Sequence, residues 1–270
     1  MTHTPLLIDR APLPGGSVET WTLNDPASRN ALSEAMVDAL LAACERAAAD
    51  AGLRGVVLRG AGGHFCAGGS LGGFAKTIGQ PLAAGEADPL VPLNRRFGTL
   101  LQALCALPQW LIVAVEGAAM GGGFGLVCCA DQVLAHSGAQ FATPEVTLGI
   151  VPAQIAPFVV RRLGQAVARR CLLTGERWDV ATAQRAGLVD EVVAGDMEAA
   201  VQTAIARHAA AAPQAVAATK RLLQAQTDTP LPALLDAAAM AFAQALRGPE
   251  ALQGLAAFAA RKAPPWSAKL

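Results

Sequence analysis

The sequence predicts an α/β fold with a helical C-terminal portion. Up to about Pro152, short runs of β-branched and aliphatic residues alternate with helical patterns. Beyond that point the chain is almost entirely Ala-rich helical pattern, broken once at GLVDEVV. The 270 residues are 53% apolar and 16% charged, which is typical of a globular protein with a large buried core.

The first elements are a strand, a turn, a helix and a second strand. SVETWTL, residues 17–23, alternates as a half-buried strand does, and NDPASRN after it is a turn. Ser33 is the expected N-cap of the helix written SEAMVDALLAACERAAAD. GVVLRG, residues 55–60, is a short apolar run between glycines and predicts a buried strand.

The middle of the chain alternates loops rich in glycine with further strands. Residues 93–106 have the apolar spacing of a helix, and residues 79–88 have the composition of a flexible loop. A pocket wall is expected somewhere in residues 74–94. The remaining segments, in order, are the loop AGGHFCAGGSLGGF, the strand LIVAV (111–115), the glycine cluster GAAMGGGFG, the strand DQVLA (131–135) and FATPEVTLGIVP, a short strand that leads into a loop.

Charge and cysteine usage exclude several classes of partner. Lys plus Arg equals Asp plus Glu, and no basic stripe is present, so neither nucleic acid nor an anionic membrane is expected to bind. The N-terminus lacks a signal-peptide pattern, and no apolar run reaches the roughly 18–20 residues of a membrane span. Six cysteines without a CxxC pair and four histidines predict free thiols in the cytoplasm and no metal site.

The glycines match none of the common nucleotide-binding motifs, because GxGxxG and a Gly-Lys dipeptide are both absent. GxSxG does occur at Gly68–Gly72, which raises the alternative of a serine hydrolase with Ser70 as nucleophile. That motif requires a strand directly before the serine. Here a loop separates Ser70 from the strand that ends near Arg59, so the match favours this alternative only weakly.

Both glycine-rich loops follow a buried strand and lead into a helix. Backbone N–H groups at a helix start are free donors, so one amide from each loop could meet on an oxygen that becomes negative, as in an oxyanion hole. Glu145, after a proline and beside apolar residues, is a candidate acid or base for such a site. The alternative interpretation of Glu145 is an ordinary exposed loop residue.

Four ordered segments resemble the crotonase (enoyl-CoA hydratase/isomerase) superfamily: NDPASRNALS, GVVLRGAGGHFCAGGSL, VEGAAMGGGFGLVCCADQVLA and FATPEVTLGIVP. The match runs from about residue 15 to 165 and continues weakly to FAARKAP. The resemblance implies a crotonase-type spiral of ββα units in residues 1–200 and a C-terminal helical trimerisation region in residues 201–270. It also implies an acyl-CoA thioester substrate, a homotrimer or dimer of trimers, and no cofactor, since CoA is part of the substrate.

The resemblance also assigns site residues. The oxyanion hole falls on the backbone N–H groups of Gly69 and Gly122, and the catalytic acid/base on Glu145. The resemblance implies that the adenine and pantetheine of CoA are bound by Arg29, Ala31, Leu32, Ala67 and Gly69. It implies that the CoA phosphates are bound by Arg261 and Lys262 of a neighbouring subunit.

Two positions depart from the family pattern. Gly125 stands where two-glutamate hydratases carry their second carboxylate, and Ser70 stands where an Asp is common. We expect Gly125 to open space in the pocket, and we expect glycines at 121–123 because a Cβ there would crowd the thioester.

The run GIVPAQIAPFVVRRLG, together with GGGFGL, looks most like the branched glutaconyl-CoA hydratases. Among these the resemblance is greater to the isohexenylglutaconyl-CoA hydratase of acyclic terpene degradation than to the methylglutaconyl-CoA enzyme. The alternatives are a Δ3,Δ2-enoyl-CoA isomerase, which also uses one glutamate, and a CoA-binding scaffold without catalysis.

Overall fold

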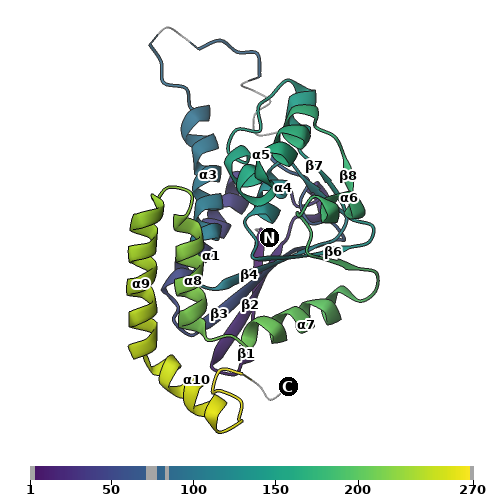
Figure 1. The fold of residues 1–270 in the computed structure, drawn as a ribbon. Helices are drawn as coiled ribbons and strands as arrows, with labels where there is room; N and C mark the ends of the chain where they lie inside the picture. Colours follow the sequence, from purple (N-terminus) through teal and green to yellow (C-terminus); the bar gives the residue numbers. More distant parts are fainter. Residues whose placement is uncertain (1–3, 71–77, 83–84, 268–270) are drawn as a thin grey trace.

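The computed structural model describes residues 4–70, 78–82 and 85–267, and these build two β-sheets surrounded by helices (Figure 1). The larger sheet has the strand order β1-β2-β3-β4-β6-β9, and the smaller has the order β5-β7-β8. The larger sheet comprises β1 Leu6–Leu13, β2 Gly16–Leu23, β3 Leu53–Gly60, β4 Trp110–Val115, β6 Gln132–His136 and β9 Glu191–Val193; the smaller comprises β5 Ala118–Met120, β7 Gln140–Ala142 and β8 Trp178–Asp179. The predicted α/β architecture is confirmed.

The central strands are parallel and buried on both faces, which explains their unbroken apolar runs. β3 pairs with β4 in parallel register, with Val57 opposite Ile112. Side chains alternate between two cores: Val56 and Leu58 face one, and Val57 faces the other with Ile112. The sheet is therefore covered on both sides.

Strand β1 was not predicted. It pairs antiparallel with β2 through a tight turn at Gly15 and Gly16, both with positive φ. Only Leu6 is fully buried along β1, because the strand forms the edge of the sheet. An exposed edge strand leaves no apolar alternation in the sequence, so the pattern could not reveal it.

The first large helix is α1, Glu34–Ala49, and it begins where expected: the Ser33 side chain accepts a hydrogen bond from the Met36 N–H. Helix α3, Leu90–Ala106, starts one turn earlier than predicted. The other helices and 3-10 turns are η1 Pro26–Ser28, α4 Gly122–Cys128, η2 Pro144–Leu148, α5 Ala156–Thr174, α6 Val180–Arg185, α7 Met197–Ala209, α8 Pro213–Ala225, α9 Leu231–Arg247 and α10 Pro249–Ala259.

Helix α7 covers one face of the large sheet. Its buried residues Met197, Val201, Ala204 and Ile205 pack in the same cluster as Val57 and Ile112 of the sheet. Each fully buried Val, Ile or Met side chain contributes about 1.5–3 kcal/mol. The predicted boundary between the core and the helical region, at residue 200, lies inside α7, and the division into two regions stays a prediction.

Helix α8 is attached to the core by a buried cation. Lys220 Nζ donates to Gln109 O at 2.6 Å and to Asp131 Oδ2 at 2.5 Å. Asp131 Oδ2 also accepts from the Leu111 N–H at 2.7 Å, so one carboxylate connects α8 to the start of β4.

Helices α9 and α10 project away from the sheets (Figure 1). They carry a set of large, exposed apolar side chains, which we call the α9–α10 apolar face: Leu231, Leu235, Met240, Phe242, Leu246, Leu252, Leu255 and Phe258.

Arg54 of β3, which is 3% exposed, joins the segment after α10 to the hairpin formed by β1 and β2. Its guanidinium donates to four backbone carbonyls, those of Pro14, Ala209, Ala211 and Trp266. Segments far apart in the chain therefore share one buried cation.

Candidate active site

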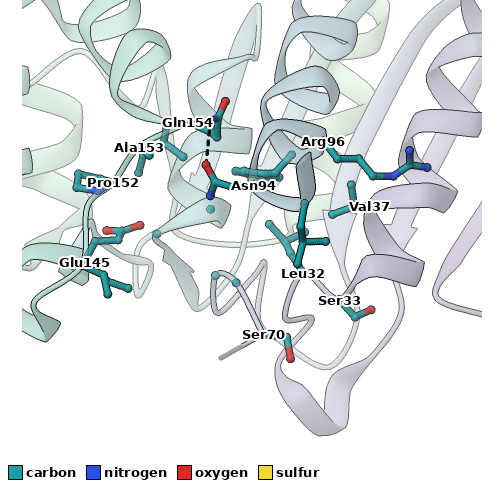
Figure 2. Close-up of a pocket in the computed structure, with 18 of the residues that line it drawn as sticks. Leu32, Ser33, Val37, Ser70, Asn94, Arg96, Glu145, Pro152, Ala153 and Gln154 are labelled. Atoms are coloured by element: carbon teal, nitrogen blue, oxygen red, sulfur yellow. Dashed lines mark hydrogen bonds between the residues drawn. The ribbon is translucent and has the colours of Figure 1, made fainter. Parts of the chain in front are cut away.

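A pocket of about 580 Å³ opens between the two glycine-rich loops and helices α1 and α3. This volume is typical of a small-molecule site. Figure 2 shows Leu32, Ser33 and Val37 on one side of it and Glu145, Pro152 and Ala153 on the other. Of the segment expected to form a pocket wall, Leu93 and Asn94 line it, while residues 74–77 and 83–84 lie outside the described residues.

The first glycine-rich loop pairs with the chain at Leu32. The Leu32 N–H donates to Gly68 O at 2.8 Å, and the Ser70 N–H donates to Leu32 O at 3.3 Å. In a parallel bridge of this kind, the N–H of the middle residue, here Gly69, points away from the partner residue, here Leu32. Within the described part of the chain, the Gly69 N–H has no protein acceptor, so it is free to bind a ligand in the pocket.

The second glycine-rich loop supplies another free amide beside it. Gly121 has φ 49° and donates to Ala142 O at 2.8 Å, which turns the chain into α4 at Gly122. The Gly122 N–H is one of the unpaired donors of a helix start. A Cβ on Gly68 would stand only 3.7 Å from Gly122 N, so the two loops touch. The structure thus brings both predicted amides to one pocket.

The structure gives a reason for glycine at 121–123 within the protein itself, and the expected crowding of the thioester stays a prediction. An added Cβ would meet Glu145 Oε1 at 2.8 Å from position 121, Leu32 Cδ1 at 2.8 Å from 122, and Cys66 O at 2.7 Å from 123. These glycines therefore permit close packing of chain segments, and a side chain would collide with the protein before it crowded a ligand. A Cβ at Gly69, by contrast, meets nothing within 4 Å.

Glu145 lies on η2 and lines the pocket. The turn is held by the Glu145 carbonyl, which accepts from the Ile150 N–H at 3.1 Å. Its Oε2 atom is buried and has no hydrogen-bond partner among the described residues. Burial raises the pKa of the Glu145 carboxyl above its ordinary value, because the charged form loses hydration. A carboxyl with a raised pKa takes up a proton more readily than an ordinary carboxylate, as a general acid or base must.

The expectation that Gly125 opens space in the pocket is wrong. Gly125 is buried in α4 and does not line the pocket. A Cβ there would overlap Ile155 Cγ2 and stand 3.7 Å from Leu101 Cδ1. Ile155 therefore occupies the space beside Gly125 and itself forms part of the pocket wall.

The residues assigned to CoA fall in two places. Leu32, Ala67 and Gly69 line the pocket, while Arg29 and Ala31 do not. The Arg29 carbonyl accepts from the Ala67 N–H at 2.9 Å, and the Ala31 N–H donates to Ser28 Oγ at 3.1 Å, so both support the loops beside it.

Arg261 and Lys262 lie beyond the end of α10 and are exposed, outside the lining of this pocket. Contact between these two residues and the CoA of a neighbouring subunit stays a prediction.

Ser70 also lines the pocket, but no described histidine or carboxylate forms a hydrogen bond with its hydroxyl. Figure 2 shows that hydroxyl directed away from Glu145. A serine nucleophile needs an adjacent base, so this arrangement disfavours a hydrolase. Among the described residues, no group of three or more His, Cys, Asp or Glu could hold a metal ion.

Sequence reasoning missed a polar pair in this pocket. Gln154 Nε2 donates to Asn94 Oδ1 at 2.8 Å, and both residues line the pocket (Figure 2). One signal was present: Gln154 is the only polar residue in the run GIVPAQIAPFVV. Its partner is 60 residues away in the chain, so no local pattern could indicate the contact.

No helix in the described part of the chain is long and apolar enough to cross a membrane.

Comparison with known proteins gives consistent results. The model of the enoyl-CoA hydratase/isomerase family matches residues 15–269. The 2,3-dehydroadipyl-CoA hydratase of Escherichia coli is 34% identical over 90% of this chain and 92% of that protein. A probable enoyl-CoA hydratase of Mycobacterium tuberculosis, EchA14, is 37% identical over 85% and 86% of the two chains.

Solved structures agree over nearly the whole chain. Pseudomonas aeruginosa AtuE has a TM-score of 0.90 and 45% identity, and covers 98% of this chain and 100% of that one. An enoyl-CoA hydratase/isomerase from Marinobacter aquaeolei has a TM-score of 0.90 and 41% identity, over 97% and 98% of the two chains. The fold is therefore of the crotonase type, and the chain belongs to the enoyl-CoA hydratase/isomerase family of enzymes.

Proposed function

We propose that this protein is an enoyl-CoA hydratase that adds water across the 2,3 double bond of an acyl-CoA thioester. The observation that carries the proposal is that two backbone amides and one carboxyl oxygen, Glu145 Oε2, all without a partner among the described residues, belong to residues that line a single pocket. The pantetheine arm of CoA would pass Leu32 and Ala67, which line the same pocket.

The two amides act on the thioester oxygen. Attack of water at C3 moves electrons through the double bond, and negative charge develops on that oxygen as an enolate. The N–H groups of Gly69 and Gly122 donate to it. One such donor contributes about 2.7–4 kcal/mol to lowering the barrier.

Glu145 moves the proton. Its carboxylate accepts a proton from water as the oxygen of that water bonds to C3, and the resulting carboxylic acid then gives a proton to C2. One carboxyl suffices for both steps, because it takes a proton from water in the first step and gives a proton to C2 in the second. A raised pKa favours this exchange near neutral pH, since the group then holds a proton without a large penalty.

The acyl chain that we propose is a branched glutaconyl group, either isohexenylglutaconyl or methylglutaconyl. The resemblance of the run GIVPAQIAPFVVRRLG supports it. A further support is the relative named for the 2,3-dehydroadipyl thioester, because an adipyl chain also ends in a second carboxyl. Apolar pocket residues such as Leu93, Leu148 and Val151 could surround a branch.

The assembly that we propose is a homotrimer or a dimer of trimers. The α9–α10 apolar face supports it, because exposed apolar patches of this kind mark protein interfaces. In such an assembly Arg261 and Lys262 would meet the CoA phosphates of a neighbouring subunit.

The test is the loss of 2-enoyl absorbance with a panel of acyl-CoAs, for wild type beside Glu145→Gln. We expect hydration of a branched glutaconyl-CoA and a fall of at least about 100-fold in the variant, because the amide cannot accept the proton of water. Full activity in the variant would remove Glu145 from the mechanism, and Ser70 would then be tested by release of free CoA thiol.

A second candidate is a Δ3,Δ2-enoyl-CoA isomerase, which one observation favours: Ile155, an apolar residue, fills the space where a second carboxylate would stand. In an isomerase Glu145 would carry a proton from C2 to C4. The same assay separates the two, because a 3-enoyl-CoA gains absorbance when the double bond moves into conjugation. A non-catalytic CoA-binding scaffold would leave the absorbance of every thioester unchanged.

A further inference from the structure

The polar pair Asn94–Gln154 has a defined direction. Gln154 Nε2 donates to Asn94 Oδ1 at 2.8 Å, so both the acceptor of Asn94 and a donor of Gln154 are used. The donor end of Asn94, its Nδ2 amide, has no protein partner among the described residues. Figure 2 shows Asn94 between Gln154 and the interior of the pocket, with Glu145 on the opposite wall.

The other end of Gln154 lies against the bare side of Gly98. Gly98, one turn after Asn94, lacks the Cβ that would overlap Gln154 Oε1. The carbonyl oxygen of Gln154 therefore occupies the space that a side chain at position 98 would need, while its nitrogen donates to Asn94.

Of the two neighbouring arginines, Arg95 does not line the pocket, and its described hydrogen bonds go to Thr99 Oγ1 and Gln102 Oε1. Arg96 lines the pocket but binds Asp38 at 2.6 Å. In Figure 2 the side chain of Arg96 extends away from Glu145, toward Val37.

Gln154 and Asn94 thus form a hydrogen-bonded pair whose remaining donor, Asn94 Nδ2, belongs to a residue that lines the pocket. The hydrogen bond that Asn94 Oδ1 accepts polarises the Asn94 amide and strengthens its Nδ2 donor. Such a donor favours an oxygen that bears negative charge over a hydroxyl or an apolar group. The rest of the wall nearby is apolar, with Leu93, Phe97 and Ile155.

We propose that Asn94 is a specificity-determining residue that binds a carboxylate at the far end of the acyl chain, and that Gln154 positions it. This inference rests on the proposed hydratase function and narrows its substrates to thioesters of dicarboxylic acids. Asn94 contacts the substrate, whereas Gln154 and Gly98 act only through Asn94.

The experiment compares matched thioesters of five carbons, glutaconyl-CoA and 2-pentenoyl-CoA, which differ only in a terminal carboxylate or methyl group. We expect wild type to prefer glutaconyl-CoA and Asn94→Leu to lower its kcat/KM about 10- to 100-fold, as for the loss of a hydrogen bond to a charged group. The kcat/KM of Asn94→Leu for 2-pentenoyl-CoA should stay within about threefold of the wild-type value. Asn94→Asp should reduce only glutaconyl-CoA turnover, by charge repulsion.

Gly98→Ala tests the positioning role by a change at a residue that does not itself line the pocket. The added methyl displaces the flexible end of Gln154, so the loss should fall on glutaconyl-CoA alone and match that of Gln154→Met. The proposal is overturned if Asn94→Leu slows both thioesters equally or neither. It is also overturned if Arg96→Gln, and not Asn94→Leu, removes the preference for glutaconyl-CoA over 2-pentenoyl-CoA.

Binding of saturated thioesters separates this inference from the reaction. Calorimetry with glutaryl-CoA and pentanoyl-CoA needs no catalysis, and we expect tighter binding of glutaryl-CoA that Asn94→Leu abolishes. If wild type hydrates neither enoyl thioester yet shows this difference, the hydratase proposal fails and the carboxylate site stands. If it hydrates both but binds the saturated pair equally, the hydratase stands and the carboxylate site fails.

Discussion

The Glu145 side chain illustrates how a residue proposed for a reaction can lower the stability of the fold. It is half-buried, and its buried Oε2 atom is unpartnered among the described residues, so the charged form is disfavoured in the folded state. Its pKa is therefore higher in the folded protein than in the unfolded chain. The folded state binds more protons in the interval between those two values, and stability falls as pH rises through it.

This gives a prediction for stability at the residue scale. Glu145→Gln should raise Tm relative to wild type at about pH 8, and the difference should shrink toward about pH 4, because the raised pKa makes wild-type stability fall as pH rises. Thermal unfolding of both proteins across this range measures the difference. Glu176→Gln is a matched control because Glu176 is partly exposed and paired with Arg170. A Tm difference that does not change with pH would show that the pKa of Glu145 is the same in the folded and the unfolded state.

Much of the site could be predicted at this scale, and the limit is physical. Gly69, Gly122 and Glu145 lie in compact motifs, and the family resemblance of those motifs is what indicated a role for each. The contact between Gly125 and Ile155, and that between Asn94 and Gln154, join positions 30 and 60 residues apart in the chain. Which side chain fills a given space depends on the packing of whole elements, and no local pattern records it.

At the scale of elements, prediction succeeded for the long helices and the buried central strands and failed for the edge strand β1 and the short strand β5. The α1 helix was found because Met36, Leu40 and Ala47 recur with helical spacing and Ser33 caps it. The three-residue strand β5 was missed because its neighbours are glycines and its partners are distant. A short strand in a small sheet is specified by its pairing more than by its own residues.

The attachment of helix α8 by Lys220 is testable. Lys220→Met should lower the free energy of unfolding by about 2–3 kcal/mol, because it leaves the partly buried Asp131 carboxylate without its cation. Urea unfolding measures the change. Arg221→Met, at the exposed neighbouring position, should stay within about 0.5 kcal/mol of wild type. Equal effects of the two changes would mean that the ion pair contributes nothing specific.

At the scale of the whole molecule, the α9–α10 apolar face and the basic pair beyond it should act together. Phe242→Glu with Phe258→Glu should shift the protein toward monomer in light scattering, since both side chains are exposed in the single chain. If a neighbouring subunit supplies the phosphate contacts, the double phenylalanine variant should raise KM for acyl-CoA about 10-fold or more. The double variant Arg261→Ala with Lys262→Ala should raise KM to a similar extent, because it removes the same contacts.

Pantetheine thioesters provide the control, because they lack the CoA phosphates and their KM should not change. An unchanged KM for acyl-CoA in the Arg261 and Lys262 variant would exclude these residues from the site.

The buried Arg54 guanidinium has a consequence for the order in which the protein is made. Its acceptors come from residues 14, 209, 211 and 266, so the cation lies in the first fifth of the chain and most of its acceptors in the last quarter. While residues 231–259 are being added, the carbonyls of Pro14, Ala209 and Ala211 are already present, but the acceptor from Trp266 is missing. We therefore expect the last hydrogen bond of this buried cation to form only after residue 266 has been synthesised, so this part of the core closes late.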